Sequence, residues 1–344
     1  MKKVLAVSSI RIDKRALNNP HTIIEFSEKD AYELIGKLTD AEEQSLIRQT
    51  GGEFVARFRQ GMKRPNEIAD GKARVRLARY CGTGEFFAVR KSQTTFIGAQ
   101  KEIFESLKDL KCVVVPHHVG VAINSKGRLT EYAFMRLYEW GDGVDFYNRV
   151  AIAPDEKLVI TFFRKFLHAC IQIHGRGIFH VDIKPENFLF KSNGEFAICD
   201  FEFATRDLLS GRLRGSPGYI APEVVEVNQT RKAYSPAQAD VWSAGVVGLT
   251  HIMPDYQNEK CHEKVNFNHP SPYVAWLKNI SPTLEQRNEI WAELASVMLH
   301  PNPAERRSLE WALKEVNDMP RNSFYSDAEF KVKFRALPAL PPGQ

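Results

Sequence analysis

The chain has 344 residues, enough for two units with hydrophobic cores if each takes roughly 100–200 residues. Its 43% hydrophobic and 26% charged residues exclude a disordered or fibrous protein, and a net charge of +5 is too small to indicate a nucleic-acid partner, although it permits an anionic ligand. The five cysteines form no C-x-x-C pair and no apolar run approaches about 18 residues, so we expect free thiols, no membrane span and a cytoplasmic location.

Residues 1–65 are expected to form a separate N-terminal extension. Within it, residues 28–38 ("EKDAYELIGKL") and 39–52 ("TDAEEQSLIRQTGG") have helical patterns, and Gly51-Gly52 is a typical helix stop. No chemistry can be attached to this part of the sequence, and its role stays open.

Residues 66–136 are expected to form a small, mainly β unit. Alternating and β-branched patterns predict strands, a "CGTG" sequence predicts a turn, and an amphipathic stretch predicts one helix. The expected strands are 73–80, 85–91, 111–115 and 132–138, and the expected helix is 99–110.

Residues 137–318 are expected to form a larger helical unit. The stretches 157–175 and 285–299 have the apolar periodicity of amphipathic helices. Residues 319–344 are treated as a C-terminal tail, and its last stretch, "ALPALPPGQ", predicts an extended or mobile segment. A small β-rich unit followed by a helical one is an α+β architecture.

The stretch "FHVDIKPENFLF" (179–190) places Asp182, Lys184 and Asn187 on one short loop between apolar flanks. The proline and asparagine within it exclude a regular helix. "HVDIKPEN" resembles the catalytic loop of protein kinases, H-R-D-x-x-x-x-N, in its serine/threonine form. The resemblance implies a bilobal protein-kinase-like fold, ATP with Mg²⁺ or Mn²⁺, and a protein substrate.

By this resemblance, Asp182 would accept or orient the proton of the substrate hydroxyl, and Lys184 would neutralise the transferring phosphoryl group. Asn187 would hold a metal ion, together with Asp200 of "ICDFEFA", which lies where the family has its metal-binding Asp-Phe-Gly. These groups would have to converge on one in-line transfer geometry.

Further motifs of the family follow in the expected order. "GSPGYIAPE" (215–223) resembles the segment that seats a protein substrate, which disfavours kinases of small molecules. Ser216, in the usual threonine position, favours serine or threonine acceptors over tyrosine. Asp240 of "DVWSAGVV" would brace the catalytic loop, and Glu223 would form a buried ion pair with Arg306.

Alignment of the motifs also implies residues that contact adenine. Met135 would gate the back of the pocket, and the backbone from Arg136 to Tyr138 would bond the adenine edge. Apolar contacts would come from both sides of the ring. The implied adenine-contacting residues are Val75, Ala88, Met135, Leu137, Tyr138 and Leu189.

Two departures from the family's pattern affect phosphate binding. Counting back from Val75, the three glycine positions of the phosphate loop hold Ile68, Asp70 and Ala73. The strand lysine that pairs with the phosphates is replaced by Arg90, with Lys91 as the alternative if a bulge rotates the strand. Glu102 would be the helical partner of this cation, and Glu105 lies one turn further on.

Two more departures lie near the proposed chemistry. Glu202 replaces the glycine of Asp-Phe-Gly and would either add a metal ligand or face solvent. Val181 replaces the arginine that receives an activation-loop phosphate, which indicates activity independent of loop phosphorylation.

The alternatives at this stage are an active serine/threonine kinase and a pseudokinase that acts as a nucleotide-binding or interaction module, with a small-molecule kinase less favoured. Degenerate glycines with an intact loop also resemble bacterial effector or viral kinases, and an effector would act in a host cytosol. The oligomeric state is left open.

Overall fold

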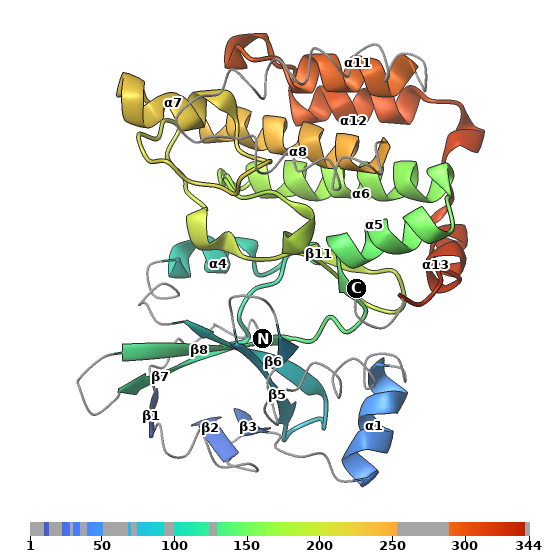
Figure 1. Ribbon diagram of the computed structural model, residues 1–344. Coiled ribbons are helices and arrows are strands. Elements are labelled where there is room, and N and C mark those ends of the chain that lie inside the picture. Colours follow the sequence, from blue (N-terminus) through green and yellow to red (C-terminus); the bar gives the residue numbers. More distant parts are fainter. Residues whose placement is uncertain are drawn as a thin grey trace. The chain divides into compact units, whose positions relative to one another are not determined.

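The computed structural model describes residues 10–13, 23–27, 30–34, 40–50, 68–69, 74–92, 100–123, 129–252 and 289–340. The chain divides into two compact units, Met1–Trp140 with Phe190–Glu195 and Gly141–Leu189 with Phe196–Gln344. Strands predominate in the first and helices in the second (Figure 1), which confirms the expected α+β class. Within the described residues, no helix is both long enough and apolar enough to cross a membrane.

The first unit is built on one eight-stranded sheet with the order β1-β7-β8-β6-β5-β3-β2, to which β4 adds by pairing with β5. β1 runs parallel to β7, and the other paired strands of this sheet are antiparallel. The strands are β1 (Ile10–Asp13), β2 (Ile23–Ser27), β3 (Asp30–Leu34), β4 (Ile68–Ala69), β5 (Arg74–Tyr80), β6 (Phe86–Ser92), β7 (His118–Ile123) and β8 (Leu129–Arg136).

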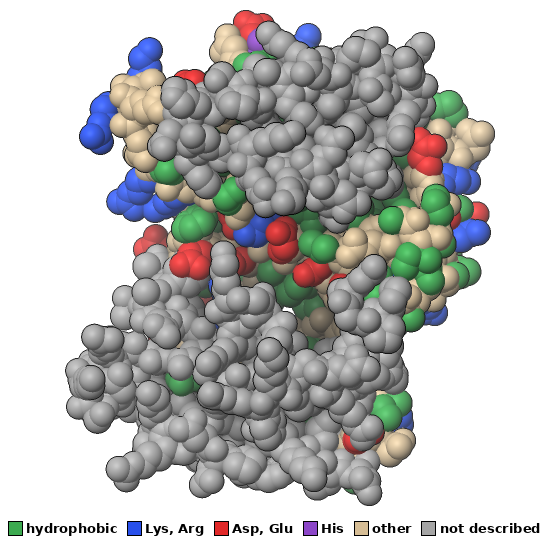
Figure 2. Space-filling model, viewed as in Figure 1, with side chains coloured by type: hydrophobic (Ala, Val, Ile, Leu, Met, Phe, Trp, Pro, Cys, Tyr) green, Lys and Arg blue, Asp and Glu red, His purple; other side chains and the backbone are tan. Residues whose placement is uncertain are grey.

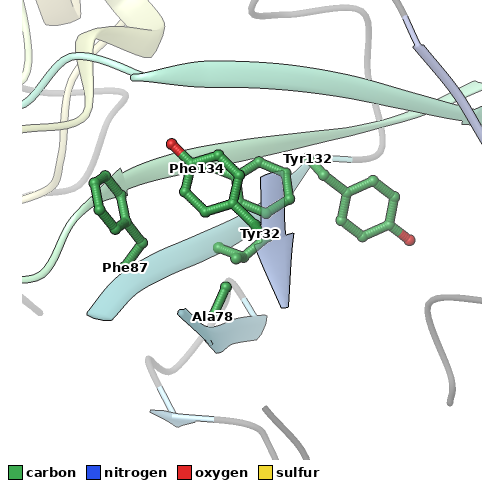
Figure 3. Packing of buried hydrophobic residues seen from close by; sticks show 6 residues of the cluster. Tyr32, Ala78, Phe87, Tyr132 and Phe134 are labelled. Carbon is green, nitrogen blue, oxygen red and sulfur yellow. The ribbon is translucent and has the colours of Figure 1, made fainter. Parts of the chain in front are cut away.

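One face of this sheet carries an aromatic core. Alternate residues of β6, Phe87 and Val89, are buried together with Tyr32 and Phe134 (Figure 3). The ring of Tyr32 lies 4.5 Å from that of Phe134 and 5.2 Å from that of Phe87. Large aromatic rings of this kind bury much apolar area and supply most of the stabilisation of a small sheet.

The N-terminal extension is part of this sheet. Tyr32 of β3 pairs with Tyr80 of β5, so the region before residue 65 contributes both strands and a core side chain. The expectation of a separate unit is therefore corrected. The expected helix at 28–38 is also wrong over β3, because burial of Tyr32 in the sheet core overrides local helix propensity.

Most other expected elements of the first unit are confirmed. Helix α1 (Asp40–Thr50), helix α4 (Lys101–Leu107), β5, the turn after it, β6 and β8 lie where the sequence places them. The strand expected at 111–115 is wrong, since β7 begins at His118 instead. Pro116, which precedes β7, has no N–H to donate to a ladder and separates this buried segment from the strand.

The second unit is a set of helices around α6. Apolar residues recur on several sides of α6, and this helix packs against α8, α12 and α13. Asp155 caps its N-terminus by accepting a hydrogen bond from the Leu158 N–H at 2.9 Å. The helices are α5 (Gly143–Ile152), α6 (Glu156–His174), α7 (Pro222–Thr230), α8 (Pro236–Ile252), α11 (Glu289–Met298), α12 (Leu309–Asp318) and α13 (Asp327–Arg335).

A three-stranded sheet with the order β11-β10-β9 carries the loops that concern function. Its strands are β9 (Gly141–Asp142), β10 (Phe188–Phe190) and β11 (Phe196–Ile198). The 3₁₀ turn η2 (Pro185–Asn187) leads into β10, and η3 (Phe201–Phe203) follows β11. The Cys199 N–H donates to the Asn187 carbonyl oxygen at 2.9 Å, so the residues flanking this hairpin lie opposite each other.

The region expected as a tail contains a packed helix. The turns η5 (Pro303–Glu305) and η6 (Arg321–Ser323) precede α13. Phe330 and Phe334 of α13 are buried, and the Phe334 ring stacks on Phe146 of α5 at 6.1 Å. The Tyr325 hydroxyl donates to Asp155 at 3.0 Å. The helical unit thus extends past the boundary at 318 that the sequence suggested.

Candidate active site

Asp240 of α8 holds the backbone of the loop that carries Asp182. It is fully buried, and its carboxylate accepts the N–H groups of His180 and Val181, both at 2.7 Å. The His174 ring also bonds this carboxylate, at 2.8 Å from Nε2. Charged acceptors form the stronger class of hydrogen bonds. The bracing role expected for Asp240 is confirmed.

His180 links this loop to the segment after β11. Its Nε2–H donates to the Cys199 carbonyl oxygen at 2.9 Å, and its Nδ1 accepts the Asp182 N–H at 3.2 Å. The ring lies 4.8 Å from the buried ring of Phe201. These contacts fix the histidine tautomer and couple the positions of Asp182 and the Asp200 segment.

Val181 adopts an unusual backbone conformation, with φ at +64°. This left-handed region is unfavourable for a β-branched residue and costs on the order of 1–3 kcal/mol. The bond from its N–H to Asp240 holds the conformation in place. This bend lies between the buried His180 and Asp182.

The Asp182 carboxylate is nearly buried and has one oxygen engaged. Oδ2 lies 3.1 Å from the Lys184 Nζ and accepts the Asn187 Nδ2–H at 3.2 Å. The same amide donates to the Asp182 carbonyl oxygen at 2.7 Å. Oδ1 is buried and receives no hydrogen bond from the described part of the chain. A buried carboxylate oxygen without a donor is costly, so Oδ1 is an acceptor that can take a further hydrogen bond.

Lys184 bridges Asp182 to the expected substrate-seating segment. Its Nζ donates to the Ser216 Oγ at 2.5 Å while it lies 3.1 Å from Asp182. The three residues predicted as catalytic, Asp182, Lys184 and Asn187, are thus brought together by direct contacts. The ammonium group is a compact positive charge of the kind that stabilises a phosphoryl group in transfer.

Asn187 and Asp200 carry side-chain oxygens of the kind that divalent metal ions prefer, on two segments joined by a backbone hydrogen bond. The donor group of the Asn187 amide faces Asp182, which leaves its carbonyl oxygen as the ligand atom. Asp200, with φ at +62°, follows Cys199, whose N–H is bonded to Asn187. Oxygen ligands are those preferred by Mg²⁺, which keeps several positions for water and phosphate oxygens. Glu202 is exposed in η3.

Glu223 and Arg306 form the ion pair that the sequence predicts. Two parallel bonds join the guanidinium to the carboxylate at 2.6 and 2.7 Å, and the Arg306 side chain is fully buried. The remaining donors reach backbone carbonyl oxygens, and the group lies 4.9 Å from the Trp242 ring. The carbonyl partners are those of His300, Gln238 and Pro301. All five guanidinium donors are satisfied, as burial of this charge requires.

The segment between η3 and Ser216 is ordered by its own hydrogen bonds. Ser210 and Tyr234 exchange backbone bonds at 2.8 and 2.9 Å, and Arg214 donates to the Phe203 carbonyl oxygen at 3.0 Å. Leu208 and Leu209 are 76% and 65% exposed. On the face shown in Figure 2, Lys and Arg side chains gather at the end of the helical unit that carries α7. Arg206 and Arg212 are also exposed, so the segment presents apolar and basic groups to solvent.

The first unit carries the residues expected to bind phosphate. Pairing of β6 with β8 is continuous from Phe87 to Ser92, so no bulge interrupts the strand. Arg90 therefore lies on the same face as Ala88, opposite to the buried Phe87 and Val89. The side chains of Val75 and Lys91 and residues 70–73 of the expected phosphate loop lie outside the described residues.

Glu102 is not brought to Arg90. It lies exposed in the first turn of α4, and no described side chain forms an ion pair with it. Glu105 pairs with Lys108 at 2.5 Å instead.

The structure shows which strand or loop carries each residue expected to contact adenine. Met135 lies opposite Ala88 in the β6–β8 pair, and β8 ends at Arg136. Leu137 and Tyr138 follow β8 and lie outside any strand. Ala88, Met135, Leu137 and Tyr138 are partly buried, whereas Arg136 is exposed. Leu189 lies, partly buried, in β10 of the three-stranded sheet.

Asp142 is a feature that the sequence analysis missed. It caps α5 by accepting the N–H groups of Val144 and Asp145 at 2.9 and 3.0 Å. Burial, with a smaller contribution from the negative charges of Asp145 and Glu186, raises its pKa to about 7 against the opposing effect of the two backbone N–H bonds. A Cβ on Gly143 would lie 2.5 Å from the Pro185 carbonyl oxygen, so α5 begins directly against the catalytic loop. An aspartate before a helical pattern was the available signal.

Comparisons with known proteins agree with this geometry. Residues 67–316, well over half of the chain, match the family described as the protein kinase domain. The chain is similar to CBL-interacting protein kinase 17 of Oryza sativa subsp. japonica, with 29% identity over 290 aligned residues. These residues make up 77% of this chain and 59% of that relative.

Two Arabidopsis thaliana proteins are also similar. CBL-interacting serine/threonine-protein kinase 20 is 32% identical over 51% of this chain and 40% of its own length. CBL-interacting serine/threonine-protein kinase 7 is 25% identical over 78% of this chain and 64% of its own length. The chain spans less than two thirds of the length of each of these relatives. With the catalytic loop, its aspartate brace and the buried Glu223–Arg306 pair in place, the chain belongs to the protein kinase family.

Proposed function

We propose that this protein transfers the γ-phosphoryl group of ATP to serine or threonine hydroxyls of a protein substrate, with Mg²⁺ or Mn²⁺. The observation that carries the proposal is the buried Asp182 Oδ1, which has no hydrogen-bond donor among the described residues, beside an Oδ2 held by Lys184 and Asn187. A substrate hydroxyl would supply the missing donor. Membership of the kinase family implies use of ATP and a divalent metal in general.

In this mechanism Asp182 holds the substrate hydroxyl at Oδ1 and takes its proton as transfer proceeds. Lys184, positioned by Asp182 and Ser216, faces the negative charge of the transferring group. Asn187 and Asp200 would hold the metal ion, which would neutralise charge on the phosphates. Asn187 is held by its bonds to Asp182, and Asp200 follows Cys199, whose N–H is bonded to the Asn187 carbonyl oxygen.

For the nucleotide we propose the residues implied by the family. Arg90, on the Ala88 face of β6, is the cation that pairs with phosphates, with Lys91 as the alternative and Glu102 as a helical partner that would have to move. Adenine would contact Val75, Ala88, Met135, Leu137, Tyr138 and Leu189. Arginine keeps the charge of the usual lysine but is larger and forked.

The bond from Lys184 to Ser216 supports a serine/threonine acceptor. Ser216 opens the segment that would seat the substrate backbone, and its hydroxyl is the group that the ammonium binds. Names of similar proteins also include serine/threonine kinase activity, which is a property of those proteins.

The test is radiolabelled transfer from ATP by the full chain to itself and to acidic and basic serine/threonine peptides, with each metal. Asp182→Asn should lower turnover about 10²–10⁴-fold and leave folding intact. Asp207→Asn is the control, because Asp207 is an exposed acid in the same unit. The proposal fails if wild-type protein transfers nothing and ATP does not raise its melting temperature, or if Asp182→Asn retains wild-type turnover.

A further inference from the structure

Three polar atoms of aromatic side chains meet in the first unit. The Tyr32 hydroxyl lies 2.5 Å from the His117 Nδ1 and 2.9 Å from the His118 Nδ1, and the two Nδ1 atoms are 3.0 Å apart. Tyr32 comes from β3, His118 is the first residue of β7, and His117 precedes it. The three atoms thus form a closed triangle between segments about 85 residues apart in sequence.

Linear hydrogen bonds cannot fill all three contacts of this triangle. Each contact needs one proton, but a ring nitrogen is either a donor or an acceptor and a phenol has one proton. When one Nδ1 accepts from the phenol and the other Nδ1 donates, two of the three contacts are linear hydrogen bonds and the third shares a proton that is already in use. If both Nδ1 atoms carry protons, the two N–H groups oppose each other. A single cation that accepts a lone pair from each atom satisfies all three contacts.

We propose that Tyr32, His117 and His118 bind one divalent transition-metal ion of the Zn²⁺ type. Imidazole nitrogen is a preferred ligand of such ions, with metal–nitrogen distances of about 2.0–2.1 Å. Ligands at that distance in a tetrahedron lie roughly 3.3 Å apart, so the triangle has to open by less than about 1 Å. Binding releases the phenolic proton of Tyr32, and a water molecule completes the coordination.

The three rings are oriented as separate ligands. The His117 and His118 planes make an angle of 82° with each other, and they make angles of 78° and 71° with the Tyr32 plane. Each ring therefore brings its polar atom to the common point from its own plane, and no two rings stack face to face.

The surroundings of the site are aromatic. The Tyr32 hydroxyl group is carried by a fully buried ring that packs on Phe134, and Phe87 lies 5.4 Å from His117. Such a shell lowers the local dielectric constant, which strengthens the attraction between a metal cation and the Tyr32 phenolate. The histidines are partly exposed, which gives the ion and a water molecule access.

The site has a structural consequence that does not depend on the proposed kinase activity. Tyr32 lies outside residues 67–316, which match the kinase family, whereas both histidines lie inside them. A bound ion would fasten the N-terminal strands to the kinase sheet. Because the unfolded chain lacks a preformed site, the binding free energy would add to the stability of the first unit.

The experiment uses the full chain, stripped with a chelator and dialysed against Zn²⁺ in excess Mg²⁺. We expect about one tightly held Zn²⁺ per chain by elemental analysis and a higher melting temperature with Zn²⁺. His117→Gln and His118→Gln should each weaken Zn²⁺ binding by at least about 100-fold. His168→Gln, an exposed histidine of α6, is the control and should bind as the wild type does.

Tyr32→Phe tests the third ligand while preserving the aromatic core. With Cu²⁺ as a probe, the wild type should show a phenolate-to-copper charge-transfer band that Tyr32→Phe lacks. Tyr132→Phe is the matched control, because Tyr132 is a buried phenol of the same cluster whose ring lies apart from Tyr32 (Figure 3). The inference is overturned if the wild type holds no Zn²⁺ after dialysis, or if the histidine variants bind it equally well.

Discussion

Replacement of Asp240 by asparagine should destabilise the helical unit and loosen the catalytic loop. The carboxylate accepts both the His180 and the Val181 N–H at 2.7 Å and has no exposed surface. An asparagine of the same shape can accept from one of these groups but turns an NH₂ toward the other. One buried backbone donor is then unpaired, which costs about 1–3 kcal/mol.

The bonds that remain also weaken, because the acceptor is now neutral. Charged hydrogen bonds are worth about 1.5–3 kcal/mol and neutral ones about 0.5–1.5 kcal/mol, so a further loss of roughly 1 kcal/mol is expected. The total, about 2–4 kcal/mol, is a large part of the stability of a typical domain. The asparagine oxygen keeps most bonds where it faces His180 and His174, so the lost bond is the one to Val181 that holds its left-handed conformation, and the loop should relax locally before the unit unfolds.

The assay is hydrogen exchange of the full chain, with denaturant unfolding measured in parallel. In Asp240→Asn the amides of His180 and Val181 should exchange much faster, and the unfolding midpoint should fall. Asp318→Asn, which alters an exposed acid paired with Lys314 on α12, should leave both unchanged. Wild-type protection of the two amides in Asp240→Asn would refute the reasoning.

Three further predictions concern charge. Folding raises the pKa of Asp142 from 3.8 to about 7, so the folded state binds the extra proton and its stability falls as pH rises from about 4 to 7. Asp142→Asn, which can still cap α5, should therefore raise the melting temperature more at pH 8 than at pH 5. An equal shift at both pH values would contradict this. Asp200→Ala should abolish the dependence of ATP affinity on Mg²⁺ in calorimetric titration, and unchanged affinity would mean that another group, such as Glu202, holds the metal. Arg90→Ala should lower phosphotransfer more than Lys91→Ala, and the reverse order would assign the phosphate contact to Lys91.

The sequence predicted the helical unit and its loop well because those motifs are local. Asp182, Lys184 and Asn187 lie within six residues, so their convergence needs one tight loop and little knowledge of distant contacts. The Glu223–Arg306 pair joins distant segments, yet it was predictable from the family resemblance. Packing of the Phe201 ring against His180 was not predicted, because the sequence around Phe201 does not identify the side chain that its ring contacts.

The first unit was predicted less well because its sheet depends on long-range pairing. Residues around Tyr32 have helical propensity, and the pairing of Tyr32 with Tyr80 that overrides it has no local signal. Alternation along β6 did predict that Ala88 and Arg90 share a face. The partner of Arg90 could not be inferred, because the position of α4 relative to β6 is set by packing.

Helix α13 has a practical consequence for anyone who shortens this protein. The match to the kinase family ends at residue 316, which would be a natural place to cut. Removal of α13 would strip away Phe330 and Phe334, expose the apolar surfaces of α5 and α6 that they cover, and leave Arg149 without its bond to the Pro338 carbonyl oxygen at 3.0 Å. A shortened protein would expose an apolar surface that promotes aggregation during expression and purification. That aggregation could be mistaken for a defect of the enzyme itself.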